Sequence, residues 1–330
     1  MSVQVEKWKA LSDFVGSEVH LITLKNSNGY SVELTNFGCI LMGIYTPDRE
    51  GNFENILLTY DLLEAYVKNE FYLNATIGPV AGRLKNGELP IEDKVYKLQI
   101  NNDINCLHSG DRGLHQVVWC IEATDTGADF DEVTLKHHHR HLEDGFPGNM
   151  DLYAVYRLNH ENELSITFKA STDRPTAVNL TNHNYYNLSG KRLNKIDDQL
   201  LFVNAEYYRE VDAHCLPLDI MTACAGTPFD FTELSPIGTA LSKGIDNPFG
   251  IAFKIDEGMP DIEYADPVSG RVMSIKTNQE AVVIYSNNGP FKTHRAICFE
   301  TQGYPNQIYK LDSTTPYVSE TTLKFGVMNR

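Results

Sequence analysis

The chain has 330 residues, 42% of them hydrophobic and 22% charged, so it can bury a sizeable core and fold in water. Its 44 acidic residues outnumber its 28 lysines and arginines, and the resulting formal net charge of -16 repels nucleic acid phosphates and anionic membranes. We therefore expect neither a nucleic acid nor a membrane as a partner.

The first ten residues, MSVQVEKWKA, contain no apolar core of the kind that a signal peptide has. No later run approaches the length needed to cross a membrane. Six cysteines are scattered along the chain without a Cys-x-x-Cys pair: Cys39, Cys106, Cys120, Cys215, Cys224 and Cys298. The simplest expectation is a cytoplasmic protein with reduced thiols.

Short alternating or apolar runs recur from one end of the chain to the other, and they are rich in Val, Ile, Thr, Tyr and Phe. The clearest runs are 31–47, 94–100, 152–158, 163–172, 199–211, 271–277, 280–287 and 296–302. Helical periodicity is weak, and residues 61–69 are the best short candidate. The pattern predicts an all-β protein, a large antiparallel β-sandwich with few short helices, formed by residues 1–330 as a single domain.

Arg83 and His108 are the first polar residues that stand out along the chain. Arg83 lies among glycines in GPVAGRLKNGEL, where close backbone packing can aim a guanidinium group. His108 follows the apolar Leu107 at the expected end of a strand. Taken singly, each is more often a surface or core residue than a functional one.

The run HHHRH, residues 137–141, is the most conspicuous cluster. Four histidines within five residues cannot surround one metal ion without irregular backbone, and no cysteine or carboxylate lies beside them at the usual zinc spacing. Because such clusters are usually at the surface, we expect a loop here and no metal.

The segment TNHNYYNLSG, residues 181–190, continues an alternating run. Val178 and Leu180 would face one side of a half-buried strand, and His183 and Tyr185 the other. An imidazole between two asparagines, with aromatic rings beside it, indicates a role beyond solubility.

Two carboxylates follow. Asp246 lies in GIDNPFG, where an Asx turn is the simplest explanation. Glu300 lies in AICFETQ, where both expected strand faces are poor in charge. Desolvation should raise the pKa of Glu300 towards that of a usable base.

The sequence contains no G-x-S-x-G elbow, no P-loop, no dinucleotide-binding glycine motif and no H-E-x-x-H. Phosphoryl transfer, dinucleotide chemistry and zinc hydrolysis therefore lack their usual motifs.

Seven segments, in order, resemble those of the aldose 1-epimerase (galactose mutarotase) family. They are NFGCILMGIYTPDREGN, GPVAGRLKNGEL, NCLHSG, EDGFPGN, VNLTNHNYYNL, GIDNPF and FETQGYPN. VNLTNHNYYNL is the most specific of them. The resemblance spans almost the whole chain and implies a large antiparallel β-sandwich whose curved sheet holds a monosaccharide in an open cleft.

The resemblance also implies an isomerase that interconverts the α and β anomers of free aldoses such as galactose or glucose. His183 would be the acid and Glu300 the base, and the polar surroundings of His183 would keep its imidazole charged. No cofactor and no metal would take part.

The resemblance implies four substrate-binding residues. His108 and Arg83 would hold oxygen atoms that gain negative charge, Asp246 would accept hydrogen bonds from hydroxyls, and Tyr185 would offer an aromatic wall. The sequence departs from the family pattern at Gly82, where an Asn is frequent, at Asn247, where a His is usual, and at Val283, where a Gln is common. The segment after Gln302 is also shorter. These departures affect hydroxyl recognition more than the acid–base pair.

Three alternatives stay open at this point. A glycoside hydrolase would use Asp246 and Glu300 as paired carboxylates. An epimerase of a phosphorylated hexose would need a cationic pocket, for which Arg83 is the only obvious candidate. A non-catalytic carbohydrate-binding protein would need neither His183 nor Glu300. We expect a monomer or a homodimer with a small monosaccharide as its partner.

Overall fold

A computed structural model of the chain describes residues 3–251, 258–286 and 294–328. Strands dominate these residues, and the α-helices among them are short. The α-helices are α1 (Lys9–Val15), α2 (Glu64–Lys68) and α3 (Gly238–Lys243), and the 3-10 turns are η1 (Lys85–Gly87), η2 (Leu114–Gln116) and η3 (Glu143–Gly145).

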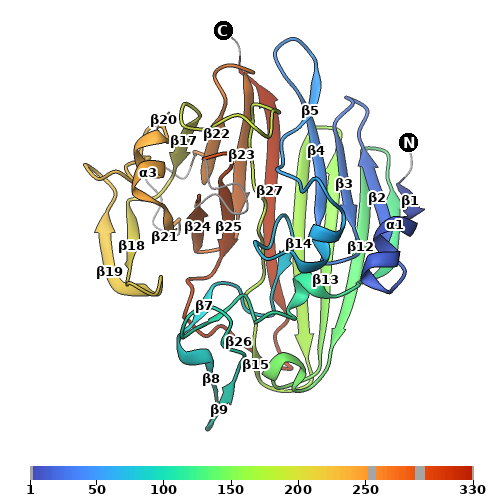
Figure 1. Ribbon diagram of the computed structural model, residues 1–330, viewed down its shortest axis with the longest axis vertical. Helices are drawn as coiled ribbons and strands as arrows, with labels where there is room; N and C mark the ends of the chain where they lie inside the picture. Colours follow the sequence, from blue (N-terminus) through green and yellow to red (C-terminus); the bar gives the residue numbers. More distant parts are fainter. Residues whose placement is uncertain (1–2, 252–257, 287–293, 329–330) are drawn as a thin grey trace.

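A nine-stranded antiparallel sheet forms the back layer (Figure 1). In spatial order its strands are β11 (Cys120–Thr126), β12 (Phe130–His139), β13 (Met150–Asn159), β14 (Glu163–Thr172), β27 (Tyr317–Val327), β23 (Arg271–Thr277), β22 (Ile262–Ala265), β17 (Leu200–Val203) and β20 (Ser235–Pro236). In β13 every second side chain is buried, from Met150 to Leu158. This period of two directs one face of the sheet to the core.

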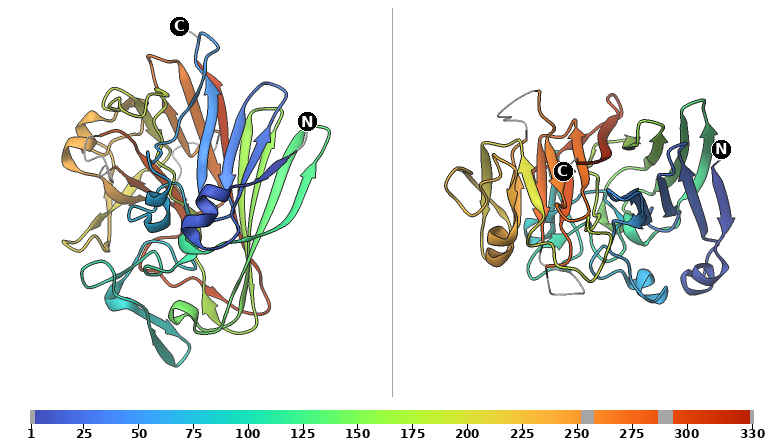
Figure 2. Two further views of the ribbon diagram at one scale, coloured as in Figure 1. Left: turned by 45° about the vertical axis from the view of Figure 1, so that its right-hand side comes forward. Right: turned by 90° about the horizontal axis from the view of Figure 1, so that it is seen from above.

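Two five-stranded sheets lie in front of the back layer (Figures 1 and 2). The first consists of β1 (Gln4–Lys7), β2 (His20–Lys25), β3 (Ser31–Thr35), β4 (Leu41–Pro47) and β5 (Phe53–Asn55). The second consists of β19 (Pro217–Ala223), β18 (Tyr207–Val211), β21 (Asp246–Phe249), β24 (Ala281–Tyr285) and β25 (Cys298–Gln302). The Phe299 ring of β25 packs on Tyr264 of β22, with 5.4 Å between ring centroids, and so joins the second sheet to the back layer.

Short two-stranded ladders complete the fold. They pair β6 (Thr76–Ile77) with β16 (Thr181–Asn182), β7 (Arg83–Leu84) with β10 (Cys106–Leu107), β8 (Glu88–Ile91) with β9 (Lys94–Lys97), and β15 (Thr176–Ala177) with β26 (Lys310–Leu311). The ladder of β7 and β10 brings Arg83 next to Leu107, the residue before His108.

The expected all-β fold is confirmed. β14 covers the predicted run 163–172, and α2 lies inside the predicted helix at 61–69. The predicted run 280–287 appears as β24, and its last residue lies outside the described residues. The sequence analysis did not predict α1 or α3.

The prediction of a surface loop at the histidine run is wrong. β12 continues through His139, which pairs with Met150 of β13. His138 is exposed, whereas His139 is 1% exposed and packs edge-on against Phe146. The long neighbouring strand β13 extends the ladder and so keeps residues 137–139 in regular strand conformation, whereas Arg140 and His141 lie beyond the strand and are exposed.

The prediction of a half-buried strand around residues 176–185 is also wrong. Two separate two-residue strands, β15 and β16, form there in place of one continuous strand, and every residue from 176 to 188 is buried. Loops and the second five-stranded sheet cover the face that the alternation assigned to solvent.

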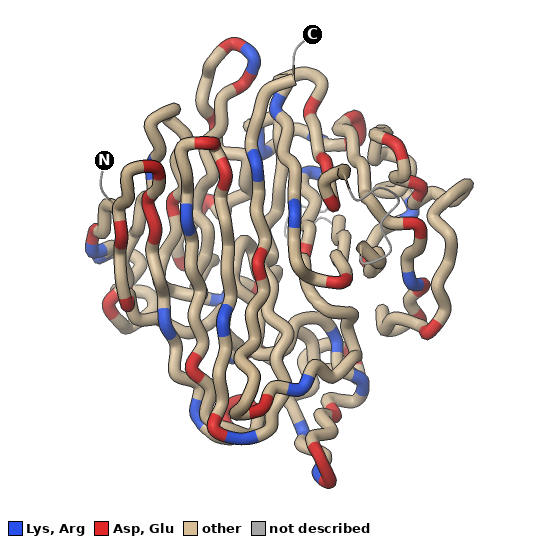
Figure 3. Tube along the Cα trace, turned by 180° about the vertical axis from the view of Figure 1, so that it is seen from behind, with Lys and Arg blue, Asp and Glu red and all other residues tan. Residues whose placement is uncertain are grey.

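Seen from behind, acidic and basic residues are interspersed over the outer face of the nine-stranded sheet (Figure 3). Within the described residues, none of the helices combines the length and apolarity that a bilayer crossing requires.

Candidate active site

All six residues that the sequence analysis singled out line one cavity of about 340 Å³. They are Arg83, His108, His183, Tyr185, Asp246 and Glu300. The cavity lies against the second five-stranded sheet, on the face that carries Glu300. Residues more than 200 positions apart in the sequence therefore meet at one site.

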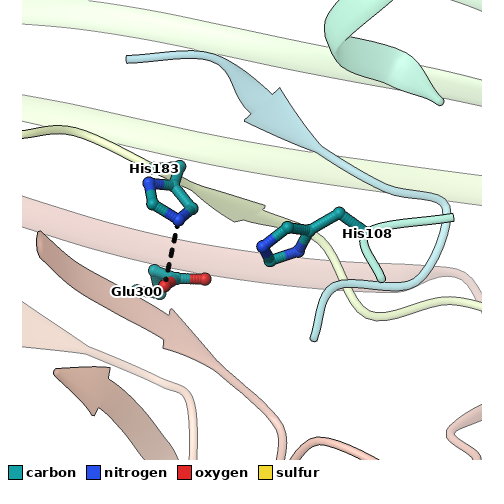
Figure 4. A group of neighbouring side chains, drawn as sticks. All are labelled: His108, His183 and Glu300. Carbon is teal, nitrogen blue, oxygen red and sulfur yellow. Dashed lines mark ion pairs between the residues drawn. The ribbon is translucent and has the colours of Figure 1, made fainter. Parts of the chain in front are cut away.

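His183 and Glu300 point toward each other (Figure 4), and both line this cavity. His183 follows β16, and its N–H and C=O are bonded to the backbone at Ala75 and Asn74. Glu300 is in the middle of β25, opposite Val283 of β24. The distance from His183 Nε2 to Glu300 Oε1 is 3.4 Å, and the two residues are 4% and 3% exposed. Both groups are thus held by regular backbone pairing, close enough to exchange a proton.

Burial sets the charge of this pair. It raises the pKa of Glu300 well above its ordinary value, and the nearby Asp246 carboxylate raises it further. The pKa of Glu300 is therefore shifted in the direction that the sequence predicts. Burial lowers the pKa of His183 to about 4. Both shifts favour the uncharged form of each group.

This shift contradicts the prediction that polar surroundings keep His183 charged. The side chain of Asn184 donates to the Tyr186 hydroxyl, so it does not solvate the imidazole. The imidazole is surrounded instead by the rings of Tyr185, His108 and Tyr285, at centroid distances of 5.1, 5.4 and 5.8 Å, and by Cys298. These groups desolvate the imidazole without neutralising a positive charge.

His108 adopts a left-handed backbone conformation with φ of 52°. Its Nδ1 accepts a hydrogen bond of 3.1 Å from the backbone N–H of Gly82, so Nδ1 carries no proton. Burial lowers the pKa of His108 well below its ordinary value, and the neutral ring then has its hydrogen on Nε2. His108 is therefore built to donate one hydrogen bond.

His108, His183 and Glu300 offer ligand atoms that all lie within 4.8 Å of one another, in a set of types that can bind zinc. A metal ion would need a lone pair on the free nitrogen of His108. That nitrogen carries the hydrogen, because Gly82 occupies the other one. The three residues therefore fit a metal ion poorly and suit proton transfer and hydrogen-bond donation.

Arg83 and Asp246 form an ion pair, with 3.1 Å between Nη1 and Oδ2. The Nε of Arg83 also donates to Asn102 Oδ1 at 2.9 Å. These two contacts orient the guanidinium and leave further N–H groups for a ligand. The prediction of a turn at Asp246 is wrong, because Asp246 begins β21 and pairs with Tyr285 of β24. Burial raises the pKa of Asp246, and Arg83 opposes that shift.

Aromatic rings enclose the site. The Tyr185 hydroxyl donates to the carbonyl of Phe71 at 2.9 Å, so its ring is fixed beside His183. Tyr72 packs edge-on against His108 with 4.6 Å between centroids. The sequence analysis missed Tyr72, Tyr285 and Asn102. The alternation in residues 280–287 could have indicated Tyr285, because it places this residue on the same strand face as Val283. No local sequence pattern indicates Tyr72 or Asn102.

A sequence model of the family described as aldose 1-epimerase matches residues 20–321 of the chain. The chain belongs to the aldose 1-epimerase family.

Individual relatives agree with this assignment. Galactose mutarotase of Bos taurus is 30% identical over 297 residues, which cover 86% of this chain and 85% of that protein. Aldose 1-epimerase of Escherichia coli K12 is 29% identical over 281 residues, which cover 83% and 80% of the two chains. The crystal structure of galactose 1-epimerase from Lactobacillus acidophilus NCFM superimposes with a TM-score of 0.88 at 27% identity, over all of both chains.

The predicted family, the all-β fold and the prediction of an isomerase that acts on carbohydrates are thereby confirmed. The roles of the six site residues stay predictions.

The departures from the family pattern have local structural consequences. Gly82 has a φ of +77°, and a Cβ atom there would lie 2.7 Å from Cβ of Pro305. Val283 is paired with Glu300 and gives the carboxyl an apolar neighbour. The Asn247 side chain donates to the backbone of Arg209, so it is engaged elsewhere. The cavity of this family member is thus less polar at Gly82 and Val283 than the family pattern implies.

Proposed function

We propose that this aldose 1-epimerase interconverts the α and β anomers of a free aldohexose such as galactose or glucose. The observation that carries the proposal is the contact of 3.4 Å between His183 Nε2 and Glu300 Oε1 in the wall of a cavity of about 340 Å³. A pair that carries one proton can donate at one ring atom while it accepts at another.

The reaction requires two proton transfers in each direction. Glu300 takes the proton from the O1 hydroxyl, the electrons form the C1–O1 double bond, and the C1–O5 bond breaks as His183 gives a proton to O5. The open aldehyde turns about the C1–C2 bond. O5 then attacks the other face of C1, His183 regains its proton from O5, and Glu300 returns its proton to O1.

The resting position of the shared proton adds one step. Burial disfavours both charges and so favours a protonated Glu300 beside a neutral His183. Acid and base are in their working forms once this proton has moved to Nε2 of His183, over the contact of 3.4 Å. Sugar hydroxyls that enter the cavity favour that transfer, because they can solvate the two charges.

Substrate binding is assigned to the remaining residues. The hydrogen on Nε2 of His108 and the free N–H groups of Arg83 donate to oxygen atoms that gain charge. Asp246 accepts from hydroxyls, and Tyr185 forms part of the wall.

The alternatives have less support. A glycoside hydrolase would need Asp246 as a second free carboxylate, but Asp246 is paired with Arg83. A phosphorylated hexose would need cationic side chains, and Arg83 is the one lysine or arginine among the described residues that line the cavity. A protein that only binds sugar would have no use for the buried pair of His183 and Glu300, whose burial costs stability.

Polarimetry tests the proposal. Freshly dissolved α-D-galactose and α-D-glucose should reach equilibrium rotation faster with the protein than without it. The variant His183→Asn should remove most of the acceleration while sugar binding persists. Release of reducing sugar from a glycoside, or acceleration with glucose 6-phosphate alone, would support the alternatives. Binding without acceleration would refute the catalytic proposal.

We also propose that residues 1–330 form one domain, which acts in the cytoplasm as a monomer or homodimer. The six cysteines are all free, as suits a reducing compartment. A single cooperative unfolding transition and the mass in sedimentation would test these points.

A further inference from the structure

Gln302 lies at the end of β25, two residues after Glu300. Side chains two apart in a strand share a face, so Gln302 points to the same side of the sheet as Glu300. It lines the same cavity. Neither the acid–base pair nor the four proposed substrate-binding residues include Gln302.

The Gln302 amide has no hydrogen-bond partner among the described residues. Both Nε2 and Oε1 are buried and unpaired, and the residue is 0% exposed. Asn102, the other amide in the lining, is bonded to Arg83. Because an unpaired buried amide costs stability, its presence needs an explanation.

The neighbours of Gln302 offer no partner for the amide. Its register partner in β24 is Ala281, and Val283 is the next residue of β24 on the same face. Gly82 and Pro305, which are in close contact, also line the cavity. Within the adjacent strand β24, the nearest residues on the face of Gln302 are therefore apolar.

We propose that the Gln302 amide recognises a hydroxyl of the sugar other than the anomeric one. This inference rests on the proposed function. An amide offers a donor and an acceptor, as a hydroxyl does, so the two can pair. The terminal torsion of glutamine is soft, so the amide can turn to meet the hydroxyl. The substrate class is then an aldose that carries this hydroxyl, and the deoxy sugar that lacks it is a poor substrate.

The variant Gln302→Met tests this role because methionine keeps the unbranched shape and removes the amide. We expect the KM for the aldose to rise about tenfold or more with little change in kcat. The melting temperature should rise, because an unpaired amide leaves the buried wall. Thr301→Val is the control on the opposite face: Thr301 bonds to Thr321, so this variant should lose stability without a change in KM.

A deoxy series identifies the hydroxyl. Wild-type protein should discriminate against one among the 2-deoxy, 4-deoxy and 6-deoxy forms of the preferred aldose, and Gln302→Met should treat that form and the parent alike. Unchanged KM and unchanged discrimination in Gln302→Met would overturn the inference, as would a fall in both kcat and melting temperature.

Calorimetric titration with the aldose separates this inference from the proposed function. If the wild-type protein binds the sugar without mutarotation, and Gln302→Met binds it at least about tenfold more weakly, the proposed function fails and the recognition role stands. Equal affinity of the two proteins would refute the role.

Discussion

Replacement of Glu300 by glutamine tests the acid–base pair with the smallest change of shape. The variant Glu300→Gln exchanges one carboxylate oxygen for an amide nitrogen at a residue that is 3% exposed and lies opposite Val283. Cavity volume and packing stay the same. The side chain no longer takes a proton from O1, nor shares one with Nε2 of His183, 3.4 Å away.

A positioned proton transfer contributes about 10²–10⁴ in rate, so kcat should fall by that factor, or about 3–5 kcal/mol in barrier height. The KM should change far less, because the contacts of Arg83 and Asp246 remain. A polarimetric progress curve at several galactose concentrations measures both constants.

The same variant has a second, opposite effect on stability. The pKa of Glu300 is raised in the folded state, so its contribution to stability is present at low pH and is lost as the pH rises through the folded pKa. Glutamine does not ionise. The melting temperature of Glu300→Gln relative to wild type should therefore increase with pH. Near-normal kcat, or a difference in melting temperature that does not depend on pH, would refute the account of this carboxyl group.

Two further predictions concern pH and backbone. The pH profile of kcat/KM should be bell-shaped, because the pair of His183 and Glu300 works with one shared proton. The value of kcat/KM should fall below about pH 4, where His183 also becomes protonated. It should also fall above the raised pKa of Glu300, where the shared proton is lost. A flat profile from pH 3 to 10 would contradict this. Gly82→Ala should lower the free energy of unfolding by about 1–3 kcal/mol more than Gly226→Ala, measured by urea denaturation. Both glycines have φ near +76°, but only the Cβ at position 82 meets Pro305, whereas position 226 is open. Equal losses of unfolding free energy in the two variants would contradict this prediction, because Pro305 would then have moved aside without cost.

Local pattern was sufficient for regular long strands and for the buried carboxyl group of Glu300. Alternation in 163–172 predicts β14 to the residue, because a regular strand with one buried face repeats every two positions. Glu300 was predicted from a charge-poor strand, and the structure buries it as expected. The family resemblance then selected His183, Arg83 and His108 from many polar residues.

Other features of the fold and the site depend on contacts between distant segments, which the sequence did not reveal. His139 is buried because η3 and Phe146 lie close to the end of β12, and no local pattern encodes that contact. The low pKa of His183 depends on rings from distant segments, and one of them, Tyr285, belongs to β24. Gln302 was visible in the strand, but its unpaired amide becomes apparent only once Ala281 is beside it.

Exchange NMR at equilibrium tests the central claim most directly, since it detects anomer interconversion without net reaction. We predict that the wild-type protein transfers magnetisation between the α and β H1 signals of equilibrated galactose or glucose, and that His183→Asn and Glu300→Gln each remove most of this transfer while the sugar still binds. Exchange that persists undiminished in the protein with both substitutions would contradict proton transfer by this pair.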